Sequence, residues 1–240
     1  MTNRIAEFKR FESQIITLPL LLHTQQYLQL VLNKEVSLTK TKALNRVTLK
    51  KIAQFIPLAS DAFEVRLERE WPYVELIDTL CDLAKLTQNR KDKKTLLKRG
   101  KDFLNDPPGI QLLVLFQTFW QGLDWAFLTY RVSEPEIATR LQENQTHCLL
   151  ILYELDSWMD VGEFCSFVKH RLNLGKDENP EFKFSLSEAL ILRVLLKNLA
   201  LFGLLEIKTE NDFSRDGTMR MSELGKEVCK IIFTHLNIEF

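Results

Sequence analysis

Two segments of this chain are rich in lysine and arginine. Their side chains are suited to binding phosphate. Residues 34–51 carry six basic side chains against one acidic side chain, and residues 89–102 carry seven against two. Such side chains neutralise the phosphates of a nucleic acid without reading its bases. A solvated wing and a solvated helix face would have the same composition. The predicted nucleic-acid-binding residues are Lys40, Lys42, Arg46, Lys50, Lys51, Arg90, Lys91, Lys93, Lys94, Lys98, Arg99 and Lys101.

Residue types used in catalysis and metal binding are present but not grouped. The four histidines are isolated, and the chain has neither a glycine-rich phosphate loop nor a G-x-S-x-G sequence. The nearest approach to a zinc set is His147 and Cys148 with Cys165 and His170. Positions 165 and 170 point to different faces of a helix, and no paired-cysteine spacing accompanies them. We therefore expect no enzyme, no metal, no cofactor and no small-molecule substrate.

The composition is typical of a folded, soluble protein of the cytoplasm. Hydrophobic residues make up 45% and charged residues 27%, which argues against general disorder. The four cysteines are scattered, as is usual in a reducing compartment. The apolar stretch 15–22 is short and broken by Pro19, so it makes a poor signal peptide. The most apolar long window, 186–205, contains three charged residues, so we expect no membrane span.

Charge is divided unevenly between the two halves of the chain. The formal net charge is zero, but residues 1–120 contain 19 Lys and Arg against 13 Asp and Glu, and residues 121–240 contain the reverse. A basic half can face nucleic acid or an acidic partner, and it can equally attract the acidic half across an interface. Charge totals leave both interpretations open because they do not say where side chains point.

Helices must position most of these residues, since glycine and proline are few and leucine is abundant. The window 110–131 contains Phe116, Phe119, Trp120, Trp125 and Phe127, so we expect it to be the central core helix. A brief extended segment is expected at 37–44, and two strands at 204–208 and 218–221. The other expected helices are 1–36 with a break at Pro19, 46–55, 74–86, a helix from Lys98, 136–155, 158–171, 186–202 and 223–236.

The last third of the chain, residues 146–236, has the order of elements of a winged-helix unit. A capping box at Ser185 starts one helix, and Gly203 is a natural stop for it. Two strands and a final helix follow. We expect Ser222 to cap that helix and Gly225 to let it lie close to the wing strand.

The first half contains a degenerate copy of the same pattern. Gly100-Lys101-Asp102 aligns with Gly225-Lys226-Glu227, 125 residues later. The copy differs in that Leu97 stands where Ser222 caps and the wing is short. These features indicate an internal repeat, and chance similarity between two lysine-rich helices is the alternative.

The segment LTKTKALNR at 38–46, followed by these two blocks in this order, resembles a known family. It is similar to the helical region of the plasmid open-reading-frame-three-like family of bacterial proteins. Members of that family are largely uncharacterised and usually carry glycine at the position of Lys42. The resemblance implies a winged-helix-containing fold and a bacterial origin, and it implies no activity.

Together these patterns predict a mainly α fold with tandem winged-helix-like units, each a set of helices with a small two-stranded wing, packed on the central aromatic helix. We expect a division into residues 1–108 and 109–240. The predicted function is a non-enzymatic DNA-associated or regulatory module that contacts the phosphates of double-stranded DNA. The alternative is a protein-interaction scaffold or homodimer in which the winged helices serve packing alone. Helix 186–202 favours burial over base reading, since Arg193 and Lys197 are its only basic residues.

Overall fold

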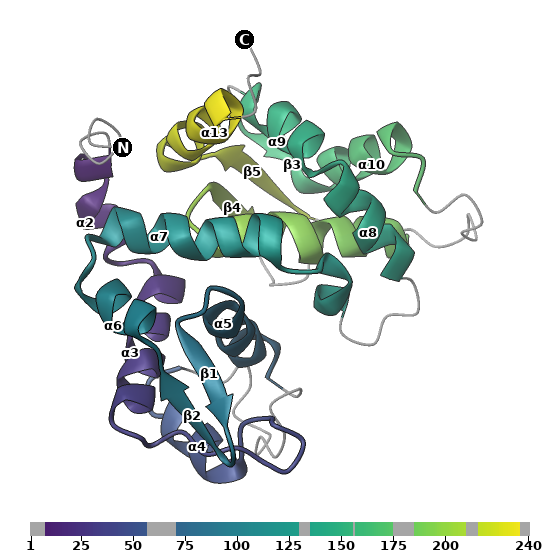
Figure 1. Cartoon of the computed structure of the whole chain (residues 1–240). Helices are drawn as coiled ribbons and strands as arrows, with labels where there is room; N and C mark the ends of the chain where they lie inside the picture. Colours follow the sequence, from purple (N-terminus) through teal and green to yellow (C-terminus); the bar gives the residue numbers. More distant parts are fainter. Residues whose placement is uncertain are drawn as a thin grey trace. The chain divides into compact units, whose positions relative to one another are not determined.

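The computed structural model describes residues 8–56, 71–129, 135–155, 157–174, 185–209 and 216–235, which are mainly helical with small antiparallel sheets (Figure 1). The predicted helix before Phe8 lies outside these ranges. Within them, every helix is too short or too polar to cross a membrane. The chain forms two compact units, residues 1–123 and 124–240. Residues 109–123 therefore group with the first unit, whereas the predicted division came after residue 108.

The first unit starts with helices that flank a short extended segment. Helix α2 (Glu12–Ile15) is followed by α3 (Pro19–Leu32), which begins at Pro19 because proline suits the first position of a helix. The extended segment comes next, and then α4 (Arg46–Ile52). The Asn45 side chain starts α4 by accepting a hydrogen bond from the Thr48 backbone N–H at 2.9 Å.

A β-hairpin between helices completes the first unit (Figure 1). Helix α5 leads into strands β1 and β2, which pair antiparallel with Thr87 opposite Leu96 and Arg90 opposite Lys93. Ser37 of the extended segment forms an isolated bridge with Lys93. The bounds are α5 (Pro72–Leu83), β1 (Thr87–Arg90), β2 (Lys93–Leu96), α6 (Lys98–Asn105), α7 (Pro108–Gln117) and η2 (Thr118–Gly122).

The prediction of one central helix over 110–131 is wrong. Helix α7 passes into the π-helical turn η2 and ends at Leu123, whose backbone is extended. The Asp124 side chain then accepts a hydrogen bond from the Ala126 N–H and starts the separate 3-10 turn η3 (Trp125–Thr129). The aromatic residues are divided accordingly, so that Phe116 and Trp120 stack in the first unit and Trp125 is buried in the second.

The second unit combines helices with a three-stranded antiparallel sheet of order β3-β5-β4. The predicted helix 136–155 is two helices, separated at Asn144. The predicted helix 158–171 starts later, because Met159 and Asp160 pair with β5 and the Asp160 side chain caps the helix that follows. The bounds are α8 (Pro135–Glu143), α9 (Gln145–Tyr153), β3 (Met159–Asp160), α10 (Val161–Arg171), α11 (Leu186–Leu190), η4 (Ile191–Leu196), α12 (Lys197–Leu201), β4 (Leu205–Thr209), β5 (Gly217–Met221) and α13 (Glu223–His235).

The predicted local features of the second unit are confirmed. Ser185 and Glu188 form a capping box at the start of α11. Gly203 follows the end of α12 with a φ of 73°, a left-handed conformation that glycine adopts without strain. The Ser222 hydroxyl accepts a hydrogen bond from the Gly225 N–H at 2.9 Å and donates one to the Gly203 carbonyl at 2.6 Å.

Both units follow the same path from the helix before the hairpin into the hairpin. Lys85 and Gly203 each end that helix in a left-handed conformation. The next residue then bonds back to the helix, with the Leu86 N–H donating to the Cys81 carbonyl and the Leu204 N–H donating to the Leu199 carbonyl, both at 2.9 Å.

The path out of the hairpin is also repeated. The Leu86 carbonyl accepts from the Leu97 N–H at 2.9 Å, and the Leu204 carbonyl accepts from the Ser222 N–H at 3.0 Å. A Cβ atom at Gly100 would collide with the first of these carbonyl oxygens, and one at Gly225 would collide with the second. The glycine alignment found in the sequence therefore corresponds to one repeated close contact.

Candidate nucleic-acid interface

The turn of the first hairpin presents a short run of basic residues. Since Arg90 pairs with Lys93, the turn itself consists of Lys91 and Asp92. Lys91 has a φ of 57°, at the first central position of a two-residue turn, where glycine is usual. Arg90, Lys91 and Lys93 are all exposed.

A second turn, in the segment before α4, is built in a similar way. Leu38 and Leu44 form a bridge, and the Thr39 N–H donates to the Ala43 carbonyl at 2.8 Å. Lys42 closes this turn with a φ of 68°. Glycine adopts such a left-handed conformation without strain, whereas lysine does so at a cost. Lys40 and Lys42 are exposed.

Hydrogen bonds join the two turns, although they lie about 50 residues apart in the chain. The Lys42 ammonium donates to the Lys91 carbonyl, and the Leu38 N–H donates to the Asp92 carbonyl at 2.7 Å. The joined turns carry five exposed cations and, in Asp92, one carboxylate. We call these cations the basic tip. They are Lys40, Lys42, Arg90, Lys91 and Lys93.

Helix α4 follows the second turn directly and continues the positive surface. Arg46 and Lys50 are exposed and lie four residues apart, on one face of the helix. The Lys51 ammonium forms an ion pair with the Glu35 carboxylate at 2.7 Å. The hydrogen bond from Lys51 lowers the pKa of Glu35. Lys51 is therefore engaged within the unit.

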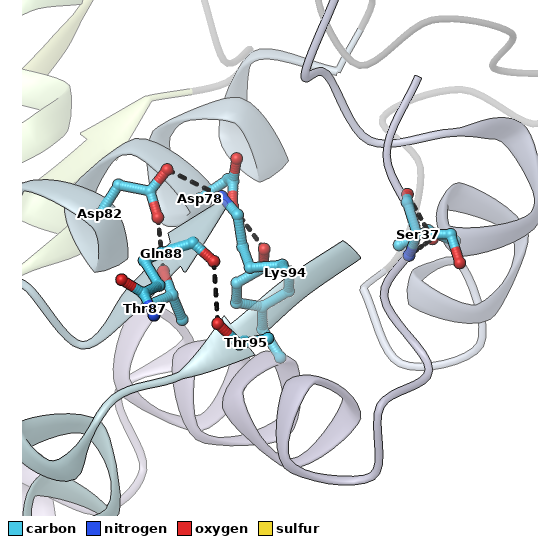
Figure 2. Close-up of polar contacts among 9 residues, drawn as sticks. Ser37, Asp78, Asp82, Thr87, Gln88, Lys94 and Thr95 are labelled. Atoms are coloured by element: carbon cyan, nitrogen blue, oxygen red, sulfur yellow. Dashed lines mark hydrogen bonds and ion pairs between the residues drawn. The ribbon is translucent and has the colours of Figure 1, made fainter. Parts of the chain in front are cut away.

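Lys94 is the predicted residue that departs most from its expected place, since its exposed fraction is only 1%. Figure 2 shows its side chain pointing toward two carboxylates of α5. The ammonium forms ion pairs with Asp78 and, at 2.9 Å, with Asp82. Tyr27 of α3 donates a further hydrogen bond to Asp78. Lys94 is thus a core residue that links β2 to α5, and it does not face a surface phosphate.

The electrostatics of this buried cluster favour charged Lys94. Burial by itself lowers the pKa of the ammonium, but the adjacent carboxylates of Asp78 and Asp82 outweigh it and raise the pKa overall. Burial, followed by the negative charge of Asp78, raises the pKa of the Tyr27 hydroxyl. The cluster therefore holds a protonated lysine and a neutral tyrosine against two aspartates.

The remaining predicted residues lie away from the basic tip. Lys98, Arg99 and Lys101 are exposed on α6, which begins beyond the Leu96 end of β2. The turn lies at the opposite end of that strand, about 10 Å away at 3.3 Å per residue. The structure therefore brings five of the twelve predicted residues into one tip and separates these three from it.

A sequence signal for the buried cluster does exist in Asp78 and Asp82, although neither residue was among the predicted ones. Asp78 and Asp82 are spaced four apart on a largely apolar helix, so they share a face. Carboxylates on such a face need a cationic partner when the helix packs. The partner, Lys94, belongs to a basic run, and only the alternation of the strand turns it inward.

Comparison with protein-family profiles, with characterised proteins and with solved structures finds no match to this chain. Among the described residues, no group of His, Cys, Asp or Glu is arranged to hold a metal ion. The four cysteines are buried.

Proposed function

We propose that each unit is a winged-helix-like unit. The first has the order helix α3, extended segment, α4, α5, β1, β2 and α6. The second has α9, β3, α10, the helical run 186–201, β4, β5 and α13. In both, the short segment between the first two helices pairs with the second strand of the hairpin. This shared order supports the proposal, with the hairpins as the wings.

We further propose that the protein is a non-enzymatic, DNA-associated module of the cytoplasm that contacts phosphates through the basic tip. The supporting observation is that Lys42 and Lys91, from distant parts of the chain, occupy joined turns in left-handed conformations. Such a conformation costs a residue other than glycine about 1–2 kcal/mol. Strain of this kind often accompanies functional sites, and here both strained residues are exposed and joined by the hydrogen bond from the Lys42 ammonium to the Lys91 carbonyl.

Fluorescence anisotropy with a labelled generic DNA duplex tests the function. We expect a Kd near the micromolar range at low salt that rises steeply with salt, as phosphate contacts require. Replacement of Lys40, Arg90 and Lys93 by Gln removes three charges of the basic tip and leaves its two left-handed residues, Lys42 and Lys91, unchanged. We expect this variant to bind about tenfold or more weakly, because each missing cation removes a counterion-release contribution.

A matched control replaces Lys98, Arg99 and Lys101 by Gln, which removes the same charge from the far end of the hairpin. We expect this control to bind within about threefold of the parent, since long-range charge effects are screened beyond about 10 Å at moderate salt. Equal decreases in affinity in the two variants would contradict a localised tip. Absence of binding at low salt would overturn the proposed function.

The rival function, a protein-interaction scaffold or homodimer, rests on a different observation. Leu83 at the end of α5 and Phe167 on α10 are large apolar side chains that are about half exposed. Analytical ultracentrifugation distinguishes the two functions. A stable dimer together with no DNA binding would favour the scaffold, and a monomer that binds DNA would favour the phosphate-contacting module.

A further inference from the structure

Helix α5 occupies the place from which many helix-turn-helix proteins read base edges. In such proteins the second helix of the pair enters the major groove, and Arg, Lys, Asn or Gln side chains contact the bases. The segment Pro72–Leu83 contains none of these four residue types. Its charged residues are Glu75, Asp78 and Asp82, which would be repelled by phosphates.

The carboxylates of α5 are also committed elsewhere. Asp78 is buried and bound to both Lys94 and Tyr27, and Asp82 accepts hydrogen bonds from Lys94 and Thr87. A reading helix needs side chains that reach outward to the bases. Helix α5 instead directs two of its polar side chains toward the hairpin, so it has a structural role.

The corresponding helical run of the second unit also has few side chains that could read bases. Residues 186–201 are mostly buried and apolar, and the two basic side chains, Arg193 and Lys197, are only partly exposed. Neither basic residue is without an interaction partner. Base reading by this run would require a row of outward polar side chains that it does not have.

The basic tip also lacks the residues that hold unpaired bases. Single-stranded nucleic acid is usually bound by stacking of its bases on aromatic side chains. Residues 36–54 and 84–102, which contain both turns and their flanking elements, include no Phe, Tyr, Trp or His. Cationic side chains are therefore the main chemistry that the tip presents.

From these features we infer that the basic tip recognises the phosphate backbone of a duplex without reading base sequence, and that it prefers a duplex to a single strand. The inference rests on the proposed function and specifies its partner. Duplex DNA carries one charge per about 1.7 Å of its axis, so it releases more counterions per contact than a single strand does. The basic tip has no side chains that stack on bases or read them, so it should bind the duplex, which has the higher charge density, more tightly than a single strand.

Competition binding with the intact chain tests the inference. A labelled mixed-sequence duplex is displaced by unlabelled duplexes of equal length that are mixed, A·T-rich or G·C-rich, and by one of the single strands. We expect all duplexes to compete within about threefold and the single strand to compete about tenfold more weakly. The slope of log affinity against log salt should fall by about 0.9 for each phosphate-binding cation that a substitution removes.

Two neutral amides beside the tip supply a direct control on base reading. Gln88 and Asn89 are exposed on β1, and amides of this type read adenine in other proteins. We expect Gln88→Ala and Asn89→Ala to leave the affinity and the order of competitors unchanged.

The outcomes separate the inference from the proposed function. A preference of more than about tenfold for one duplex sequence would overturn the inference while leaving DNA binding intact. A single strand that competes as well as the duplex would do the same, as would a sequence-dependent effect of the Asn89 variant. No binding to any duplex at low salt would overturn the proposed function itself.

Discussion

At one position of the repeated hairpin, the first unit buries a lysine where the second buries a methionine. Lys94 lies six residues before Gly100, and Met219 lies six residues before Gly225. The facing helix differs in the same way, since Asp78 lies eight residues before Leu86 and Leu196 lies eight before Leu204. All four of these core side chains are buried.

The difference shows that one chain path accepts either an ionic or an apolar link between hairpin and helix. An ionic link stabilises the fold only when each buried charge has enough charged or hydrogen-bonding partners to offset its desolvation. In the first unit they are complete, because Lys94 has two carboxylates and Asp78 also receives the Tyr27 hydroxyl. In the second unit the equivalent residues, Met219 and Leu196, are buried apolar side chains, which need no such match.

The largest expected effect comes from breaking the ionic link on one side. Lys94→Met alone copies the second unit but leaves Asp78 buried without its cation. We expect a loss of about 3–5 kcal/mol in the free energy of unfolding of the first unit, because an unpaired buried charge remains. Urea titration followed by circular dichroism measures this loss, and hydrogen exchange at residues 86–97 localises it.

The matched control is a triple variant that makes the whole buried cluster apolar, as in the second unit. Lys94→Met, Asp78→Leu and Tyr27→Phe together replace every partner by an apolar group, and we expect the triple variant to be as stable as the parent or more stable. A triple variant as unstable as the single one would show that the two units are not interchangeable at this position.

Deprotonation of Lys94 at alkaline pH should lower the free energy of unfolding of the first unit, by less than the loss expected for Lys94→Met. The folded-state pKa of Lys94 is raised above its ordinary value of 10.5, so its contribution is fully present below pH 10.5 and is lost as the pH rises through the folded-state value. We therefore expect the parent to lose more stability than the triple variant between pH 10 and strongly alkaline solution, as measured by urea titration at each pH. Parallel curves for the two proteins would contradict the assignment.

Gly100 and Gly225 test whether the two units share the same close contact. Gly100→Ala and Gly225→Ala each place a Cβ against a backbone carbonyl, so we expect each to cost about 1–3 kcal/mol, with similar values in the two units. Gly122→Ala is the control, because its Cβ meets only a Thr118 methyl at 3.8 Å, an ordinary contact. Thermal unfolding of the three variants measures these losses. An unchanged unfolding temperature after substitution of either Gly100 or Gly225 would contradict the shared contact.

The smallest effect concerns the helix cap that one unit has and the other lacks. Ser222→Ala removes the hydroxyl that accepts from the Gly225 N–H, and we expect a loss of about 1 kcal/mol. Leu97, at the equivalent place, provides no side-chain cap for α6. Leu97→Ser should stabilise the first unit by less than about 1 kcal/mol, since the new cap is partly offset by reduced apolar packing. Differential scanning calorimetry of both variants tests the opposite signs.

Residue types alone were enough to predict the features that depend on neighbours within one turn of helix. The capping box at Ser185, the stop at Gly203 and the cap at Ser222 each need residues only a few positions away, so their residue types were sufficient. The alignment of Gly100 with Gly225 was visible for a related reason, because the same close contact requires the same residue in both copies.

Which basic residues lie together depends on contacts between distant parts of the chain. The Lys42 ammonium meets the Lys91 carbonyl 49 residues away, and Tyr27 reaches Asp78 across 51. The two-residue strand Met159–Asp160 exists because β5 pairs with it, since so short a segment has no periodicity of its own. Whether a lysine such as Lys94 faces water or the core depends on the partners that packing brings to it, and local residue types do not specify those partners.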